Sequence, residues 1–263
     1  PVSLRALDDL ELPELCWLFV DRLLAFDHLE GRISAIGLGF ADDADLARER
    51  AERAAAQPLP GVAPGSRFRR SGRRTAPAGA SPCFDEGSYQ KAIVRAKEHI
   101  EAGDVYQVCL TRRSELAFDG DPWRLYRELR EINPAPFAAY LDLGDLTVLS
   151  SSPERFLSLS RDGRVESRPI KGTRPRGGDP PSDRAQERAL RTSQKDRAEN
   201  LMIVDLVRND LGRVCETGSV QVPELMRIES YATVFQMVST VRGRLRSDRD
   251  VFDLLRAAFP PGS

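Results

Sequence analysis

The stretch VESRPIKGTRPRGG, residues 165–178, decides how the rest of the chain is interpreted. Its first six residues alternate imperfectly between apolar and polar side chains, as expected of a β-strand. Pro169 and Pro175 fix φ on either side of Lys171, while the glycines of the stretch permit a tight turn and close approach to a small ligand. The pattern predicts a lysine held in a defined position at the end of a strand.

The residues around this lysine suggest a site for a small anion. Lys171 follows an apolar pair, so its ammonium is expected to be partly desolvated, which favours the neutral, nucleophilic amine. Gly172 and Thr173 offer backbone N–H groups and a hydroxyl to a carboxylate, and Arg174 and Arg176 add positive charge. The alternative, which composition alone favours, is a solvated basic turn whose lysine does no chemistry.

A family resemblance favours the chemical interpretation. Residues 169–173 (PIKGT) resemble the signature of the aminodeoxychorismate synthase component I branch of the chorismate-utilising enzymes, a family that includes anthranilate and isochorismate synthases. Five further blocks follow the family's order: GDVYQV at 103–108, SSPERF at 151–156, KDRAEN at 195–200, DLVRND at 205–210 and LLRAAFP at 254–260. The similarity is strong over roughly the last two-thirds of the chain and weak at its start.

The resemblance implies an α+β fold in which two antiparallel β-sheets pack face to face, with outer helices and a central cleft. It implies a remnant of an N-terminal lobe at residues 1–57 and the N-terminal part of a chorismate-binding domain at 83–263, and the composition of residues 58–82, rich in Pro, Gly and Arg, indicates a linker between them. Both ends of the chain are expected to be truncated, so the fold is incomplete at the C-terminus and the fragment alone is expected to be inactive. The alternation of elements does not by itself exclude a parallel α/β sheet.

The resemblance also implies a reaction and its residues. The family branch aminates chorismate to 4-amino-4-deoxychorismate, for p-aminobenzoate and folate biosynthesis, using ammonia from a glutamine amidotransferase subunit or domain. By resemblance, Lys171 is the nucleophile and Glu154 transfers the proton to the departing hydroxyl. Gly172 and Thr173 contact the substrate, and Glu199 binds Mg²⁺ together with a ligand beyond the last residue of this chain.

Simpler roles remain open for several of these residues. Glu154 could instead pair with Arg155 or Arg168. Asp196, one helical turn before Glu199, could add a second carboxylate, although pairing with neighbouring basic residues is simpler. Gln107 is most simply a half-buried polar residue of a strand.

Two rival functions are considered. The first is a sister enzyme, anthranilate or isochorismate synthase. Two residues argue against it. Anthranilate synthase has alanine at the place that matches Lys171 and histidine at the place that matches Gln236. The second rival is a non-catalytic binding fragment.

Composition narrows the classes further. The chain has 263 residues, of which 41% are hydrophobic and 30% charged, with a net charge of −1, so general nucleic-acid affinity is not expected despite the basic cluster at 67–70. No apolar run approaches the ~18 residues of a membrane span, and no signal peptide is evident. The cysteines are scattered without CxxC spacing, which favours free thiols and a cytoplasmic protein.

Hydrophobic periodicity predicts the elements. We expect helices at 43–57, 88–102, 122–132, 184–211 and 250–259, with a loop at 178–183. We expect strands at 32–40, 105–110, 137–143, 147–150, 156–160, 219–222 and 231–244, and a strand or helix at 16–26.

Overall fold

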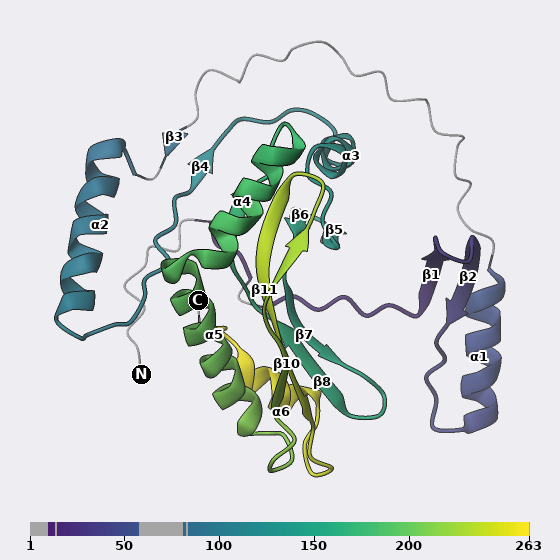
Figure 1. Cartoon of the computed structure of the whole chain (residues 1–263). Helices are drawn as coiled ribbons and strands as arrows, with labels where there is room; N and C mark the ends of the chain where they lie inside the picture. Colours follow the sequence, from purple (N-terminus) through teal and green to yellow (C-terminus); the bar gives the residue numbers. More distant parts are fainter. Residues whose placement is uncertain (1–9, 14, 58–80, 83, 263) are drawn as a thin grey trace. The chain divides into compact units, whose positions relative to one another are not determined.

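The computed structural model describes residues 10–13, 15–57, 81–82 and 84–262 (Figure 1). The chain divides into two compact units, residues 1–76 and 77–263. The division falls inside the segment expected to be a linker, most of which, 58–80, lies outside the described residues. Within the described residues, no helix combines the length and apolar character that crossing a membrane requires.

The first unit is a β-hairpin with one helix. Strands β1 (Arg22–Asp27) and β2 (Arg32–Gly37) pair antiparallel, and α1 (Ala44–Ala56) packs against β2. Two glycines permit this contact, because a Cβ at Gly37 would lie 2.0 Å from a carbonyl oxygen of α1, and one at Gly39 would lie 1.7 Å from another. The expected helix is confirmed, while the first strand begins at Arg22 and not at residue 16.

The second unit holds the remaining elements. Its helices are α2 (Glu86–Glu101), α3 (Pro122–Ile132), α4 (Pro180–Thr192), α5 (Gln194–Gly212) and α6 (Val251–Ala258). Two strand pairs stand apart from its main sheet: β3 (Ser81–Pro82) with β4 (Ser114–Glu115), and β5 (Phe137–Asp142) with β6 (Thr147–Ser152). The main sheet contains β7 (Arg155–Leu159), β8 (Arg164–Arg168), β9 (Ile170–Pro175), β10 (Gln221–Ser230) and β11 (Val234–Arg244).

The main sheet is antiparallel and is built around β11. Its order is β10-β11-β8-β7, and β9 pairs with β11 along the same edge as β8. Pro169 separates β8 from β9 because it has no N–H to donate, but its carbonyl oxygen accepts a hydrogen bond from the Ser239 N–H at 3.1 Å. Strands β8 and β9 are therefore one strand interrupted at Pro169, two residues before Lys171.

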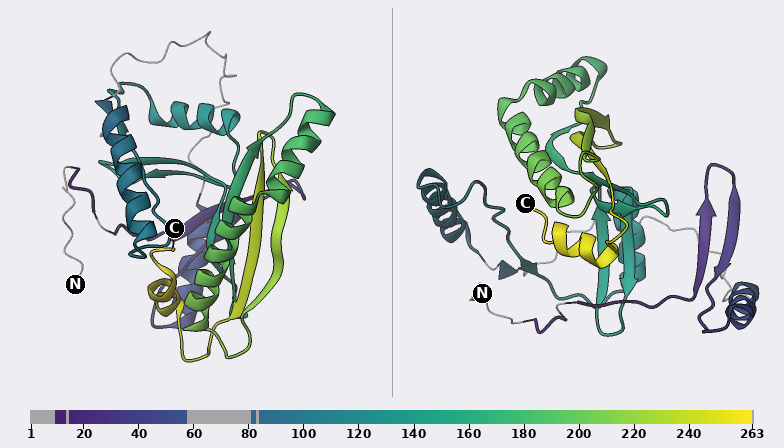
Figure 2. Two further views of the ribbon diagram at one scale, coloured as in Figure 1. Left: turned by 60° about the vertical axis from the view of Figure 1, so that its left-hand side comes forward. Right: turned by 90° about the horizontal axis from the view of Figure 1, so that it is seen from below.

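Helices α4 and α5 lie along the same side of the long strands (Figure 2). The larger buried cluster joins β8, β11, α5 and α6, and consists of Val165, Val204, Leu211, Val214, Cys215, Val241, Leu254 and Ala257. A smaller cluster joins α4 to β11 through Leu190, Phe235 and Met237. The mixed α+β class is thus confirmed. Helices α4 and α5 cover one face of the main sheet.

Several other expectations about elements are wrong. Residues 105–110 form no strand, because no ladder partner lies beside them within the described residues. The long helix expected at 184–211 is two helices, since Ser193 ends α4 and its side chain caps α5. Helix α4 also begins earlier than expected, at Pro180, where proline is tolerated in the first turn.

Candidate active site

Lys171 is the second residue of β9, two positions after the interruption at Pro169. Its side chain is half-buried, and within the described part of the chain its ammonium makes no hydrogen bond or ion pair. Gly172 follows with a φ of +90°, and a Cβ there would lie 2.8 Å from Cβ of Asp196 and 2.9 Å from Cδ1 of Leu190. Lys171 therefore directly precedes a backbone turn that only glycine accommodates, and Gly172 of that turn lies against the start of α5.

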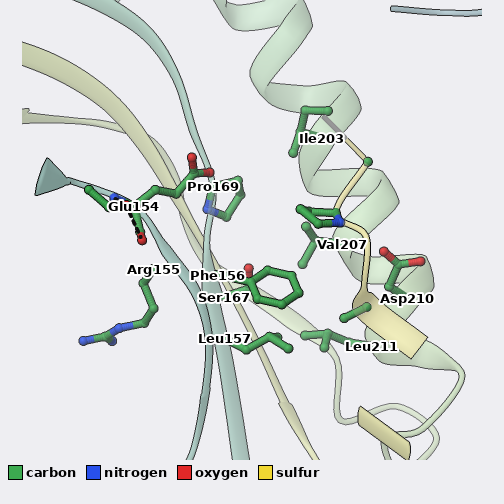
Figure 3. A pocket seen from close by; sticks show the side chains of 14 residues that line it. Glu154, Arg155, Phe156, Leu157, Ser167, Pro169, Ile203, Val207, Asp210 and Leu211 are labelled. Carbon is green, nitrogen blue, oxygen red and sulfur yellow. Dashed lines mark hydrogen bonds between the residues drawn. The ribbon is translucent and has the colours of Figure 1, made fainter. Parts of the chain in front are cut away.

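Glu154 reaches the same interruption from the opposite strand. Its Oε1 accepts a hydrogen bond from the Ile170 N–H at 3.1 Å, and Figure 3 shows its side chain beside Pro169. The ion pairs weighed for Glu154 are not formed, because Arg155 pairs with Glu166 and Arg168 pairs with Glu229. The Glu154 carboxylate thus binds the backbone at Ile170, the residue before Lys171. Its second oxygen is available to a ligand.

Glu199, on the second turn of α5, is held by an amide. Gln107 Nε2 donates to Glu199 Oε1 at 2.9 Å, and the carbonyl oxygen of the same Gln107 is buried without a partner among the described residues. Since a carboxylate only accepts, this contact fixes which end of the amide faces Glu199. Gln107 was expected in a strand, but the structure makes it a half-buried partner of Glu199.

Oxygen donors of this kind fit a hard divalent cation. Within the described residues, no group of three or more His, Cys, Asp or Glu gathers as a complete metal cage. Mg²⁺ commonly takes only one or two carboxylates and completes its shell with water and substrate oxygens. Glu199 fits such a site. Its Oε1 accepts a hydrogen bond from Gln107, its other carboxylate oxygen is available to a cation, and the Gln107 side-chain carbonyl has no partner among the described residues.

The arginines of the central stretch are already paired. Arg174 Nη2 lies 2.8 Å from Asp196 Oδ2, so Asp196 does form an ion pair, but with Arg174 of β9 and not with the neighbouring basic residues that were expected. Arg176 binds both oxygens of Asp183 at 2.7 Å. Hydrogen bonds from Arg176 and from the Gly177 N–H lower the pKa of Asp183 to about 2. These two arginines hold β9 to α4 and α5.

A second polar network occupies the neighbouring part of the sheet. Arg168 pairs with Glu229, and Tyr231 donates its hydroxyl to the same carboxylate at 2.8 Å. Burial and this hydrogen bond raise the pKa of the Tyr231 hydroxyl above its usual value. Gln236 on β11 lies between these groups, opposite Glu229 of β10 on one side and opposite Thr173 of β9 on the other.

A cavity of about 220 Å³ lies between the sheet and α5. Its walls include Ser152 and Ser167 from the strands, Glu154 from the turn between β6 and β7, Asp210 from α5, and Pro261 near the end of the described chain (Figure 3). Of the residues predicted for the site, Glu154 lines this cavity, whereas Lys171, Gly172, Thr173 and Glu199 do not. The structure thus joins Glu154 to the start of β9 and places Glu199 with Gln107.

Lys171 and the backbone N–H groups that follow it suit a small anionic ligand, and comparison identifies the family of the chain. The family of chorismate binding enzymes matches residues 2–263, so the chain belongs to that family. It is 47% identical, over 95% of its length, to an aminodeoxychorismate synthase of Streptomyces griseus, of which it covers 35%. It is 42% identical to anthranilate synthase component 1 of Streptomyces coelicolor, with 96% of this chain and 51% of that protein covered.

Among solved structures, the fold resembles anthranilate synthase component I from Streptococcus pneumoniae. The TM-score is 0.72 at 29% sequence identity, and the match covers 92% of this chain and 53% of that one. The chain thus spans about a third to a half of the length of these relatives.

Proposed function

We propose that the protein is component I of an aminodeoxychorismate synthase, which replaces the ring hydroxyl of chorismate with an amino group to give 4-amino-4-deoxychorismate. The observation that carries the proposal is Lys171, half-buried at the β9 start and without a partner among the described residues. Relatives named for aminodeoxychorismate and for anthranilate synthesis are both similar to this chain. The lysine favours the first, since anthranilate synthases have alanine at the matching place.

The chemistry begins with the lysine nitrogen. Lys171 attacks the chorismate ring, a C–N bond forms, and the C–O bond to the ring hydroxyl breaks. Glu154 gives the departing hydroxyl a proton, so that water leaves, and later takes a proton back. Its hydrogen bond to the Ile170 N–H keeps this carboxyl within reach of the ring that Lys171 attacks. General acid–base assistance of this kind contributes ~10²–10⁴ in rate.

The residues after the lysine bind and orient the substrate. The Gly172 N–H and the Thr173 hydroxyl are the donors that we assign to a carboxylate of chorismate, since both follow directly in β9. The pairing of Arg174 and Arg176 with acidic residues of α5 and α4 fixes the backbone that carries these donors. Correct placement of ring and amine is itself a large part of such catalysis.

Glu199 would hold Mg²⁺, with Gln107 orienting its carboxylate. When bound, Mg²⁺ neutralises substrate carboxylate charge and acts as a Lewis acid. A glutamine amidotransferase subunit or domain would supply the ammonia that displaces the lysine, as the name "component 1" of similar proteins implies a second component.

We also propose the fuller architecture of the family, with a second antiparallel sheet facing the five-stranded one across a cleft, and residues 58–82 as a linker between lobes.

The proposal is tested by product analysis on the full-length protein, with whatever sequence flanks residues 1–263. Chorismate, Mg²⁺ and ammonium chloride should give 4-amino-4-deoxychorismate by liquid chromatography. Glu154→Gln should lower kcat by ~10²–10⁴, while Glu98→Gln, on the exposed face of α2, should match wild type. Anthranilate or isochorismate as the main product would reject the proposal.

A further inference from the structure

Gln236, near the start of β11, carries a buried hydrogen-bond acceptor that is not satisfied. The residue is only 7% exposed, and its Oε1 has no hydrogen-bond partner among the described residues. Buried polar atoms are nearly always paired, because an unpaired one loses its hydrogen bonds to water without replacement. An acceptor in this state indicates that a donor from outside the described residues completes the site.

The register of the sheet places this acceptor on the face that carries Thr173, two residues after Lys171. Phe235 and Met237, the neighbours of Gln236, both pack in the cluster with Leu190 of α4, so alternation turns Gln236 to the opposite face. Thr173 lies directly opposite Gln236, so the two side chains share that face. A Cβ on Gly172 would instead point at Leu190 and Asp196, on the helix-covered face.

Gln236 is also near Lys171 across the strands. It lies directly opposite Thr173, and the β9 strand gains one residue relative to β11 between this pair and the next, Ile170 with Val238. Lys171 is therefore a diagonal neighbour of Gln236, at ~7–8 Å between backbone positions, within reach of two long side chains.

The chemistry of the acceptor selects the donor. The carboxylates of chorismate only accept hydrogen bonds, so a carbonyl oxygen does not attract them. The ring hydroxyl is assigned to Glu154, which reaches β9 from the β7 side. Ammonia carries three N–H donors and one lone pair, so one N–H can bind a carbonyl while the lone pair faces carbon.

We propose that Gln236 binds ammonia, the second substrate, through its Oε1 and turns the lone pair toward the ring carbon held by Lys171. This inference rests on the proposed function. In the step concerned, the ammonia nitrogen bonds to the ring carbon that carried the hydroxyl, the bond from the ring to the lysine nitrogen breaks, and one ammonia proton passes to the lysine nitrogen. The products are the amino compound and free Lys171, so atoms and charge balance.

The test separates formation of the lysine adduct from its discharge by ammonia, in the full-length protein. Gln236→Met keeps the length of the side chain but removes the acceptor. We expect its KM for ammonium chloride to rise about 5- to 10-fold, as for loss of one hydrogen bond. Adduct formation with chorismate in the absence of ammonia, followed by intact mass, should keep its wild-type rate, and the adduct should then disappear more slowly when ammonium is added.

Two further variants complete the test. Gln236→Glu retains acceptor oxygens and should restore the wild-type KM for ammonium, and Gln221→Met, at the exposed start of β10, should behave as wild type. An unchanged KM for ammonium in Gln236→Met would overturn the inference, and so would slower adduct formation, which would make Gln236 a partner of Lys171. Wild-type protein that forms no adduct would overturn the proposed function along with it.

Discussion

Glycine at position 172 is required on two independent grounds. Its φ of +90° is a conformation that other residues rarely adopt, and a Cβ would lie 2.8 Å from Cβ of Asp196. Each of these two effects is expected to lower the free energy of unfolding by ~1–3 kcal/mol when glycine is replaced by a residue with a side chain. Gly172→Ala should therefore lower the free energy of unfolding by at least ~1 kcal/mol in urea titrations. Gly178→Ala, where nothing lies within 4 Å of the added methyl, is the control, and equal stability of the two variants would contradict this account.

Gln107 should matter through the carboxylate that it holds. Its Nε2 lies 2.9 Å from Glu199 Oε1, and removal of such a supporting partner typically weakens metal affinity 10–100-fold, roughly. Gln107→Leu should weaken Mg²⁺ binding by about that factor in calorimetric titrations without chorismate. Gln90→Leu removes a similar amide–glutamate contact on α2 and should leave the Mg²⁺ affinity unchanged; equal affinities in the two variants would argue against a metal role for Glu199.

For single residues, the sequence predicts a site only when its residues are close together along the chain. Lys171, Gly172 and Thr173 were predicted together because they are contiguous. The contact between Gln107 and Glu199 spans 92 positions, and no local pattern indicates such a pair. Gln236 stood out only as a departure from a related enzyme, and its buried, unsatisfied carbonyl became visible only in the folded sheet.

At the scale of elements, the ion pair of Arg176 and Asp183 joins the end of β9 to α4. Because the pKa of Asp183 is lowered from 3.8 to about 2 in the folded state, the pair stabilises fully above pH 3.8 and loses its effect as the pH falls through about 2. Asp183→Asn should lower Tm at neutral pH, and the difference from wild type should shrink below pH 3.8.

The matched control is Asp205→Asn, which removes a surface ion pair with Arg208 on α5. It should change Tm little at any pH, since exposed pairs contribute only ~0–1 kcal/mol. A difference between wild type and Asp183→Asn that persists undiminished at pH 2.5 would contradict the role given to the pair.

Element boundaries were predicted where the local signals are strong. Helix α2 ends before Gly103, which has a φ of +79°, as its sequence predicts. The break between α4 and α5 was missed because Ser193 is neither Gly nor Pro, although serine is a common cap. Strand β10 was predicted too short because Pro223 interrupts its pattern; the strand tolerates proline at an edge, beside a register shift.

At the scale of the whole molecule, α5 and α6 are held to the sheet by the larger buried cluster. Leu211 is fully buried there, and its truncation to alanine should cost ~2–5 kcal/mol of unfolding free energy. Leu201, on the same helix, is 52% exposed, and Leu201→Ala should change stability by only ~0.5 kcal/mol. Similar losses in the two variants, measured by urea unfolding, would show that this cluster is not what stabilises the second unit.

The α+β class could be predicted from the sequence because its blocks resemble one family. The order of the strands could not, since pairing of β9 with the same edge of β11 as β8 depends on contacts between segments distant in the chain. Nor could periodicity distinguish the helix-covered face of β11 from the other, because its residues from 235 to 241 are all buried.

The most direct measurement is the intact mass of the full-length protein after incubation with chorismate and Mg²⁺ in the absence of ammonia. The account predicts a covalent adduct with the mass of chorismate less one water, present in wild type and in the exposed-lysine control Lys97→Ala but absent in Lys171→Ala. An adduct that survives in Lys171→Ala, or wild-type protein that makes 4-amino-4-deoxychorismate once ammonium is added without ever forming one, would contradict the account.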